Sequence, residues 1–161
     1  GTSFKCVSRK VQCMSAGEYC NRGVVIVNKS ESVREAISLM RAHHVGDVVV
    51  VDKEGGEPIP QGILTDRDIV LEILAEDVDL DAVNIGDVMS CELATVDEDT
   101  SLMDVIKVMR SKGVRRIPVV NKRGALVGIL TADDVIELVA EQLADIVTLI
   151  SREGAREMQR R

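Results

Sequence analysis

The sequence contains two copies of one pattern, and this repeat restricts the possible folds more than any other feature. The segment GILTDRDIV at 62–70 returns as GILTADDVI at 128–136, and SVREAISLMR at 32–41 returns as SLMDVIKVMR at 101–110. The two matches lie 66 and 69 residues apart, and the difference falls in a Gly- and Pro-rich turn at 53–61. Turns tolerate such insertions. The chain of 161 residues therefore contains two copies of one supersecondary unit that share an interface.

Each copy predicts the order strand, helix, strand, turn, strand, helix. Short β-branched or apolar runs mark the expected strands, which are 24–27, 48–51 and 62–64 in the first copy and 93–96, 117–120 and 126–130 in the second. Ser32 and Ser101 are expected to cap the helices that follow them, because an acidic residue comes three positions later in each copy. Strands and helices that alternate in this way indicate an α/β fold.

The last helix is predicted to begin at Ala132 and to extend to Ile150 or Gly154. One apolar stripe runs along it and consists of Ile136, Val139, Leu143, Ile146, Val147 and Ile150. This stripe is longer than a small domain needs to cover its own core. We therefore expect the far end of the helix to pack on a partner chain, and we expect a homodimer.

Composition and charge exclude several classes of protein. The chain has one Phe, one Tyr and no Trp, so its core is aliphatic and it lacks the aromatic platforms on which single-stranded nucleic acid stacks. Its net charge of -7 repels phosphate backbones. No apolar run approaches the roughly 20 residues of a membrane span, and no signal peptide is recognisable. We expect a cytoplasmic protein that binds neither nucleic acid nor membrane.

The four cysteines leave two hypotheses open. They are Cys6, Cys13, Cys20 and Cys91, and the first three lie seven residues apart. One hypothesis is a metal-linked or redox sensor that uses these cysteines together with His44. The other is reduced thiols, with Cys20 and Cys91 packing as small apolar side chains. Zinc ligands usually include a pair two to four residues apart, which favours the second hypothesis.

The order β-α-β-β-α, found twice with Gly-Ile-Leu-Thr-x-x-Asp opening each final helix, resembles the cystathionine-β-synthase (CBS) domain. Two such units in tandem resemble a Bateman module of the small stand-alone bacterial type. The resemblance implies two CBS repeats packed through their sheets with pseudo-two-fold symmetry. The expected boundaries are an N-terminal extension at 1–15, derived in part from a tag, a first repeat at 16–77, a linker at 78–86, a second repeat at 87–145 and a C-terminal helix extension at 146–161.

Each repeat carries a Thr and an Asp where its last strand meets its last helix, namely Thr65 with Asp68 and Thr131 with Asp134. A helix N-terminus attracts phosphate, and an ionised carboxylate accepts bonds from both ribose hydroxyls. The resemblance implies these roles for the Thr and the Asp. The same pattern also forms a simple helix cap, which is the alternative interpretation.

Arg115 and Arg116 precede a strand in the second copy, where the resemblance implies phosphate contacts, and Asp47 stands in the place of Arg116 in the first copy. We therefore expect a single phosphate-rich site, with Asp134→Ala more damaging than Asp68→Ala. Pro118 predicts an edge strand or a strand with a free N–H position. The expected ligand-binding residues are Asp47, Ile63, Thr65, Asp68, Arg115, Arg116, Pro118, Ile129, Thr131, Asp133 and Asp134.

The resemblance implies a regulatory module that senses AMP, ADP or ATP in the cleft between the repeats and signals by conformational change to an unidentified regulated protein. No cofactor is required, and Mg²⁺ would arrive with the nucleotide. The sequence shows no Ser-His-Asp order, no Cys-His pair with a supporting acid and no Walker-type loop, so we expect no enzyme. Besides the metal-linked or redox sensor, the alternatives are binding of S-adenosylmethionine or NADH.

Overall fold

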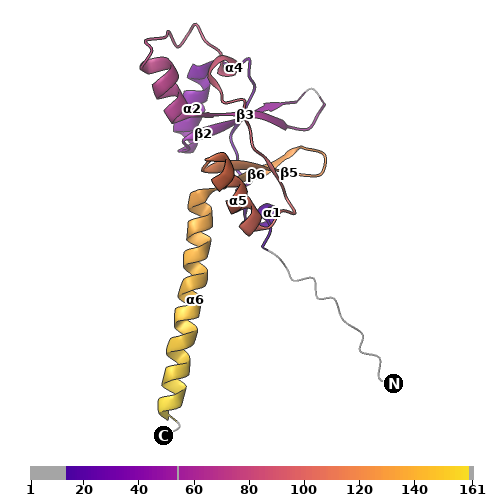
Figure 1. Ribbon diagram of the computed structural model, residues 1–161. Helices are drawn as coiled ribbons and strands as arrows, with labels where there is room; N and C mark the ends of the chain where they lie inside the picture. The colour runs from indigo at the N-terminus through magenta and orange to yellow at the C-terminus, as the bar shows by residue number, and fades with distance from the viewer. Residues whose placement is uncertain (1–13, 54, 160–161) are drawn as a thin grey trace, which may run out of the picture.

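The computed structural model describes residues 14–53 and 55–159. The expectations for Cys6, Cys13 and a tag-derived start fall outside these residues. Figure 1 shows two small α/β units stacked on each other and one helix that extends far beyond them. Within the described residues, no helix has the length and apolar character that a membrane crossing requires.

Each unit contains a three-stranded sheet. The first consists of β1 (Ile26–Val27), β2 (Asp47–Asp52) and β3 (Ile59–Thr65), and the second of β4 (Val96–Asp97), β5 (Arg116–Val120) and β6 (Leu126–Thr131). The central strand pairs in parallel with the first and antiparallel with the third. The outer strands β1 and β4 are shorter than the sequence predicts. The β3 strand is longer and includes Pro60, which an edge strand accommodates.

The two helices predicted for each repeat are present in the predicted order, and two short helices, at 16–19 and 85–88, were not predicted. The helices are α1 (Ala16–Tyr19), α2 (Val33–His43), α3 (Asp66–Ile69), α4 (Ile85–Val88), α5 (Leu102–Lys112) and α6 (Ala132–Gln159), and a π-helical turn, η1 (Val70–Leu74), continues α3. The predicted caps are confirmed, because the hydroxyl of Ser32 accepts a bond from the N–H of Glu35 and that of Ser101 from the N–H of Asp104, both at 3.2 Å. The last helix reaches five residues beyond Gly154.

Each unit completes its core with a segment that belongs, in sequence, to the other repeat. The α1 helix packs Ala16 and Cys20 into the core of the second unit. The α4 helix packs the fully buried Ile85 into the core of the first, together with Leu80 and Val83 from the expected linker. Equivalent backbone bonds hold both helices, such as Gly17 N–H to the Glu98 carbonyl and Gly86 N–H to the Lys29 carbonyl, each at 2.9 Å. The two repeats are therefore interleaved.

The two sheets face each other through a small apolar layer. Its buried members are Val49 and Val51 of β2 and Ile129 of β6, and Ile63 and Leu126 pack against them. The expected packing through the sheets, with pseudo-two-fold symmetry, is confirmed. The layer is aliphatic throughout, as the shortage of aromatic residues predicts. This packing brings the end of β3, which carries Thr65, and the start of β5, which carries Arg116, to the junction between the two repeats.

Pro118 lies in the central strand of the second sheet, so the prediction of an edge strand is wrong. The partner across the ladder, Ile129, directs both its N–H and its carbonyl to Asn21, so the Pro118 nitrogen faces the β4 side and no bond to β6 is lost. In the first unit, Val49 at the equivalent position donates its N–H to the Val25 carbonyl at 2.9 Å. Pro118 has no such donor, so the equivalent bond to the Ala94 carbonyl is not made.

Candidate functional site

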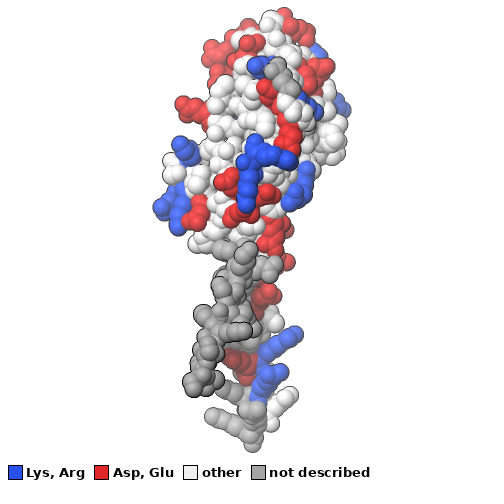
Figure 2. Space-filling model, turned by 90° about the vertical axis from the view of Figure 1, so that its right-hand side faces the viewer, with Lys and Arg blue, Asp and Glu red and all other residues white. Residues whose placement is uncertain are grey.

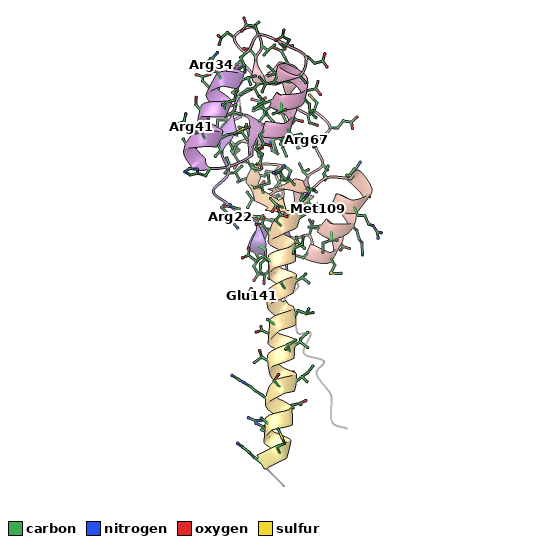
Figure 3. All side chains as sticks on the ribbon, turned by 90° about the vertical axis from the view of Figure 1, so that its left-hand side faces the viewer. Arg22, Arg34, Arg41, Arg67, Met109 and Glu141 are labelled. Carbon is green, nitrogen blue, oxygen red and sulfur yellow. The ribbon has the colours of Figure 1, made fainter. Side chains whose placement is uncertain are left out.

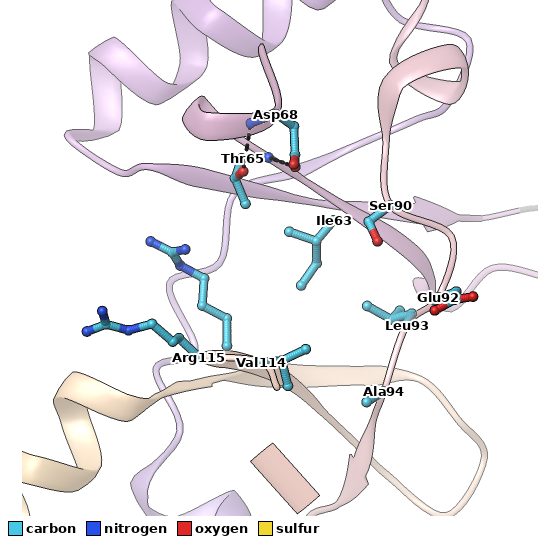
Figure 4. Close-up of a pocket in the computed structure, with 10 residues that line it drawn as sticks. Ile63, Thr65, Asp68, Ser90, Glu92, Leu93, Ala94, Val114 and Arg115 are labelled. Carbon is cyan, nitrogen blue, oxygen red and sulfur yellow. Dashed lines mark hydrogen bonds between the residues drawn. The ribbon is translucent and has the colours of Figure 1, made fainter. Parts of the chain in front are cut away.

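A cavity of about 200 Å³ lies at the junction of the two repeats. Figure 4 shows Ile63 facing it from β3 and Val114 from the loop before β5, with Leu93 at its side. The lining residues are Ile63, Thr65, Asp68, Ser90, Glu92, Leu93, Ala94, Val114, Arg115 and Arg116. The cavity therefore combines apolar walls with polar side chains that carry two carboxylates, two hydroxyls and two guanidinium groups.

Thr65 and Asp68 reach this cavity from the end of β3 and the start of α3. They form a reciprocal cap, in which the Thr65 N–H donates to Oδ2 of Asp68 at 2.9 Å and the Asp68 N–H donates to Oγ1 of Thr65 at 3.1 Å. The cap interpretation is therefore correct. It does not exclude a ligand, because a carboxylate has two oxygens and several acceptor positions, of which this cap occupies one.

Arg116 comes from the other repeat and forms an ion pair across the junction. Its Nε lies 2.6 Å from Oδ2 of Asp47, the first residue of β2. The Asp47 side chain is 16% exposed and that of Arg116 is 38% exposed. Asp47 and Arg116 occupy equivalent positions in the two copies, so the pair joins them across the pseudo-two-fold axis. Asp47 therefore compensates the charge of Arg116 directly.

Arg115 makes the second ion pair at the rim of the cavity. Its Nη2 lies 3.0 Å from Oδ1 of Asp133, in the first turn of α6. Both side chains are about three-quarters exposed, 75% for Arg115 and 79% for Asp133. Exposed pairs of this kind contribute little to stability. Arg115 can therefore exchange Asp133 for another anion at little energetic cost.

Burial raises the pKa of the Asp47 carboxyl above its ordinary value, although Arg116 beside it acts in the opposite direction and Asp66 adds slightly to the rise. The folded protein thus binds a proton at Asp47 more readily than the unfolded chain does. This carboxyl destabilises the fold at neutral pH, and the destabilisation disappears as the pH falls through the raised pKa.

We predict that wild type gains stability relative to Asp47→Asn, which cannot titrate, as the pH is lowered from about 7 to about 4. Urea unfolding of both proteins at several pH values measures this difference. If the difference changed in the opposite direction, the Arg116 ion pair and not burial would dominate the energetics of Asp47.

The second Thr-Asp pair forms the same cap but lies outside this cavity. The Thr131 N–H and Oγ1 both donate to Oδ2 of Asp134, at 2.9 and 2.7 Å. The sequence associates the arginines with Asp134, but in the structure Arg115 and Arg116 line the cavity that Asp68 lines. The backbone of Arg116 pairs with Thr131 of its own repeat, but its side chain crosses the junction to Asp47 of the other.

The structure thus gathers five of the expected residues around one cavity and holds two more beside them. Ile63, Thr65, Asp68, Arg115 and Arg116 line the cavity, while Asp47 and Asp133 pair with its arginines. Pro118, Ile129, Thr131 and Asp134 do not line it. Sequence reasoning missed Ser90, Glu92, Leu93, Ala94 and Val114. Segment 90–94 carries no motif, and only its antiparallel bridge from Ser90 to Ile63 brings it to the cavity.

The cysteines and histidines do not gather in the described part of the chain. Cys20 is buried in the core of the second unit, as predicted, but Cys91 is exposed, so its expected packing is wrong. His43 ends α2 and His44 caps it. Within 14–53 and 55–159, no three His, Cys, Asp or Glu residues lie close enough together to hold a metal ion.

Two pseudo-symmetric units of this topology, with a cavity at their junction, define a regulatory ligand-binding module. The chain belongs to the CBS domain family, which matches residues 16–75 and 85–141. A curated relative, the uncharacterized protein MK0525 of Methanopyrus kandleri, is 37% identical over 128 residues, which make up 80% of this chain and 64% of that protein.

Solved structures with this fold carry different ligands. Hypoxic Response Protein I with two coordinated zinc ions is 31% identical with a TM-score of 0.67, covering 77% of this chain and 98% of that one. The cytosolic domain of the Mg²⁺ channel MgtE in complex with ATP is 27% identical with a TM-score of 0.65, covering 78% and 48%. The CBS pair of MJ0100 with 5-methylthioadenosine and S-adenosyl-L-methionine is 25% identical with a TM-score of 0.68, covering 78% and 99%.

Proposed function

We propose that this protein senses adenine nucleotides of the AMP, ADP and ATP class, which bind in the cavity between the repeats and shift their arrangement. One observation carries the proposal: a Thr and an Asp from one repeat share a cavity with two arginines from the other. A ligand that contacts both repeats binds one relative arrangement of the repeats more tightly than another. Such a difference in affinity is required for a ligand to produce a conformational signal.

The cavity offers a partner for each part of a nucleotide. Asp68 has the acceptor oxygens for two ribose hydroxyls, and the apolar walls suit the faces of a purine. The Ala94 carbonyl, which receives no bond from Pro118, is an acceptor for the amino group of adenine. Arg115 and Arg116 provide planar, multiple donors for phosphate. The cavity of about 200 Å³ suits the nucleoside part, while the exposed Arg115 holds phosphates at its mouth.

Phosphate binding changes the ion pairs at the junction. Arg116 is paired with Asp47 and Arg115 with Asp133 in the free protein. A phosphate that takes both arginines must displace both carboxylates. Asp47 starts the central strand of the first sheet and Asp133 lies in the first turn of α6, so the displacement acts on both repeats. We propose that this exchange starts the conformational signal to a regulated protein.

The relatives support a ligand that contains adenosine. The structure of the MgtE domain is a complex with ATP, and that of the MJ0100 pair is a complex with 5-methylthioadenosine and S-adenosyl-L-methionine. We propose further that the protein acts without catalysis, without a resident cofactor and as a homodimer in the cytoplasm, with Mg²⁺ accompanying the phosphates of ATP. The CBS-CP12 protein from bloom-forming cyanobacteria has this fold and is hexameric, so oligomers occur in this fold.

The deciding experiment is a thermal-shift panel of AMP, ADP, ATP with and without Mg²⁺, S-adenosylmethionine and NADH. A ligand at about 100 times its dissociation constant stabilises the folded state by about 2.7 kcal/mol. We expect a rise in Tm of roughly 5–10 °C for a chain of this size. The double variant Arg115→Ala/Arg116→Ala is expected to lose the response to ATP and to keep a response to adenosine.

The outcomes separate the proposed nucleotide from its alternatives. If no member of the panel raises Tm at millimolar concentration, the proposal is wrong. S-adenosylmethionine is the second candidate, favoured by the MJ0100 complex and by Glu92 at the cavity, since a carboxylate suits a cationic ligand. A response to S-adenosylmethionine that is larger than the response to ATP and survives loss of both arginines identifies this candidate. Stoichiometric zinc in protein purified without chelator would instead support the metal-linked sensor.

A further inference from the structure

The α6 helix exposes an apolar stripe along most of its length. Figure 3 shows its side chains projecting into open space below the two units. Ile136, Leu143 and Ile150 are 64%, 61% and 62% exposed, and Val139, Ile146 and Val147 are between 53% and 59% exposed. A row of aliphatic residues at helical spacing with this exposure is typical of a helix that lacks its packing partner.

The stripe is symmetric about Leu143. Apolar residues lie three positions away on both sides (Ala140, Ile146), four positions away (Val139, Val147) and seven positions away (Ile136, Ile150). Spacings of three, four and seven return to the same helix face. The stripe is therefore the same when read in either direction, and a second copy of the helix matches it whether the two run parallel or antiparallel.

Charge distinguishes the two directions. The first half of the helix, 132–145, contains five acidic residues and neither Lys nor Arg, which gives -5. The sequence from 146 onward contains four Arg and two Glu, which gives +2. Figure 2 shows the acidic residues close to the body and basic residues farther along the helix. Antiparallel helices matched about Leu143 place segment 132–142, which carries -4, against segment 144–154, which carries -1, whereas parallel helices place -4 against -4 within a Debye length.

The surface beside the start of α6 also favours an antiparallel partner. Apolar grooves of about 640 and 270 Å³ flank this part of the helix, lined by residues of α5 and α6, with Ile106 and Val139 in both. The far half of α6 is exposed from residue 146 to residue 156, so the far half of a partner's α6 can enter such a groove as a single helix. A helix laid into an apolar groove is a common recognition mode.

We propose that α6 pairs with α6 of a second copy in antiparallel direction, with the two-fold axis at Leu143. Ile136 of one copy then packs against Ile150 of the other, and Val139 against Val147. The proposal rests on the homodimer suggested above but not on any nucleotide, since the pairing forms without ligand. The two bodies then lie at opposite ends of the helix pair, and each covers the far half of its partner's α6.

Disulfide cross-linking of the full chain tests the direction. Two proteins are made, one with Ile136→Cys and one with Ile150→Cys, and each carries a different mass tag. In both proteins Cys6, Cys13 and Cys91 are replaced by Ser. The two proteins are mixed, allowed to exchange subunits and mildly oxidised. We expect a disulfide that joins position 136 of one protein to position 150 of the other. Each variant alone is expected to cross-link little. Efficient cross-linking of either variant to itself would show parallel pairing and overturn the proposal.

Sedimentation equilibrium tests whether the stripe forms the interface. Leu143→Asp buries a charge in the proposed contact, so we expect the dimer dissociation constant to rise about 100-fold or more. The matched control is Thr148→Asp, which places the same carboxylate on the opposite, exposed side of α6 and is expected to leave dissociation unchanged. The proposal would be overturned if the wild-type protein were a monomer at roughly 100 μM, a concentration at which weak association is still detected. Equal effects of the two variants on dissociation would also overturn it. Both outcomes are independent of the nucleotide panel.

Discussion

Asp68→Asn is expected to remove most of the stabilisation by ATP, whereas Asp134→Asn is expected to remove little. Asp68 lines the cavity that contains Arg115 and Arg116, and Asp134 does not. Hydrogen bonds to a charged group contribute about 1.5–3 kcal/mol each, so loss of the carboxylate is expected to weaken ATP binding roughly 10- to 100-fold. The ATP-dependent rise in Tm, followed as a function of ATP concentration, measures the dissociation constant of each variant.

The pair of variants supplies its own control. Asp68 and Asp134 make the same cap, with Oδ2 2.9 Å from the N–H of Thr65 and of Thr131. The Asn side chain retains an oxygen acceptor, so both substitutions are expected to cost the free protein a similar, small amount of stability. Equal weakening of ATP binding would show that both motifs bind nucleotide. Greater weakening by Asp134→Asn would restore the order expected from the sequence and contradict the assigned cavity.

Gly128→Ala is expected to destabilise the fold by roughly 2–3 kcal/mol, the largest effect on stability that we predict for a single methyl group. A Cβ at Gly128 would lie 2.6 Å from the Asn21 carbonyl oxygen and 2.6 Å from Sγ of Cys20. Asn21 is held against β6 by two backbone bonds with Ile129, at 2.8 and 2.9 Å. Because the obstacle is backbone, relief requires the segment after α1 to move away from β6.

Gly154→Ala is the matched control, because it makes the same chemical change inside α6, where a Cβ meets nothing within 4 Å. This substitution is expected to stabilise the helix by roughly 0.5–1 kcal/mol, since Ala favours helix over Gly. Urea unfolding measures both changes. If Gly128→Ala left the free energy of unfolding unchanged, the close approach of the two repeats at β6 would not limit the size of the side chain at position 128.

Gly128 also shows where sequence reasoning was incomplete. From the sequence, Gly62 and Gly128 are isolated glycines of a strand or turn. In the structure each marks the place where a segment of the other repeat crosses the third strand, and a Cβ at Gly62 would lie 2.7 Å from the Ser90 carbonyl oxygen. The Gly-Ile-Leu-Thr motif therefore requires its glycine for close approach between repeats. No local pattern indicates which segment makes that approach.

Elements that depend on nearby residues could be predicted. The Ser32 and Ser101 caps, the buried central strands and the long α6 follow from spacings of two to four residues, and the structure confirms them. Strand bounds were less accurate, because pairing partners decide where a strand ends. Pro118 has no N–H to donate to β4, so one bond of the ladder is missing. For this reason β4 begins one position later in the second repeat than β1 does in the first.

The sequence by itself determined that this protein has two related α/β units, an aliphatic core, two Thr-Asp caps and a long terminal helix with an apolar stripe. Its local periodicities and spacings are sufficient for those conclusions. Only the tertiary structure decided that α1 and α4 exchange between the units and that the arginines join Asp68, not Asp134. The reason is physical: these relations join residues far apart in the chain, which meet only when the two sheets pack face to face.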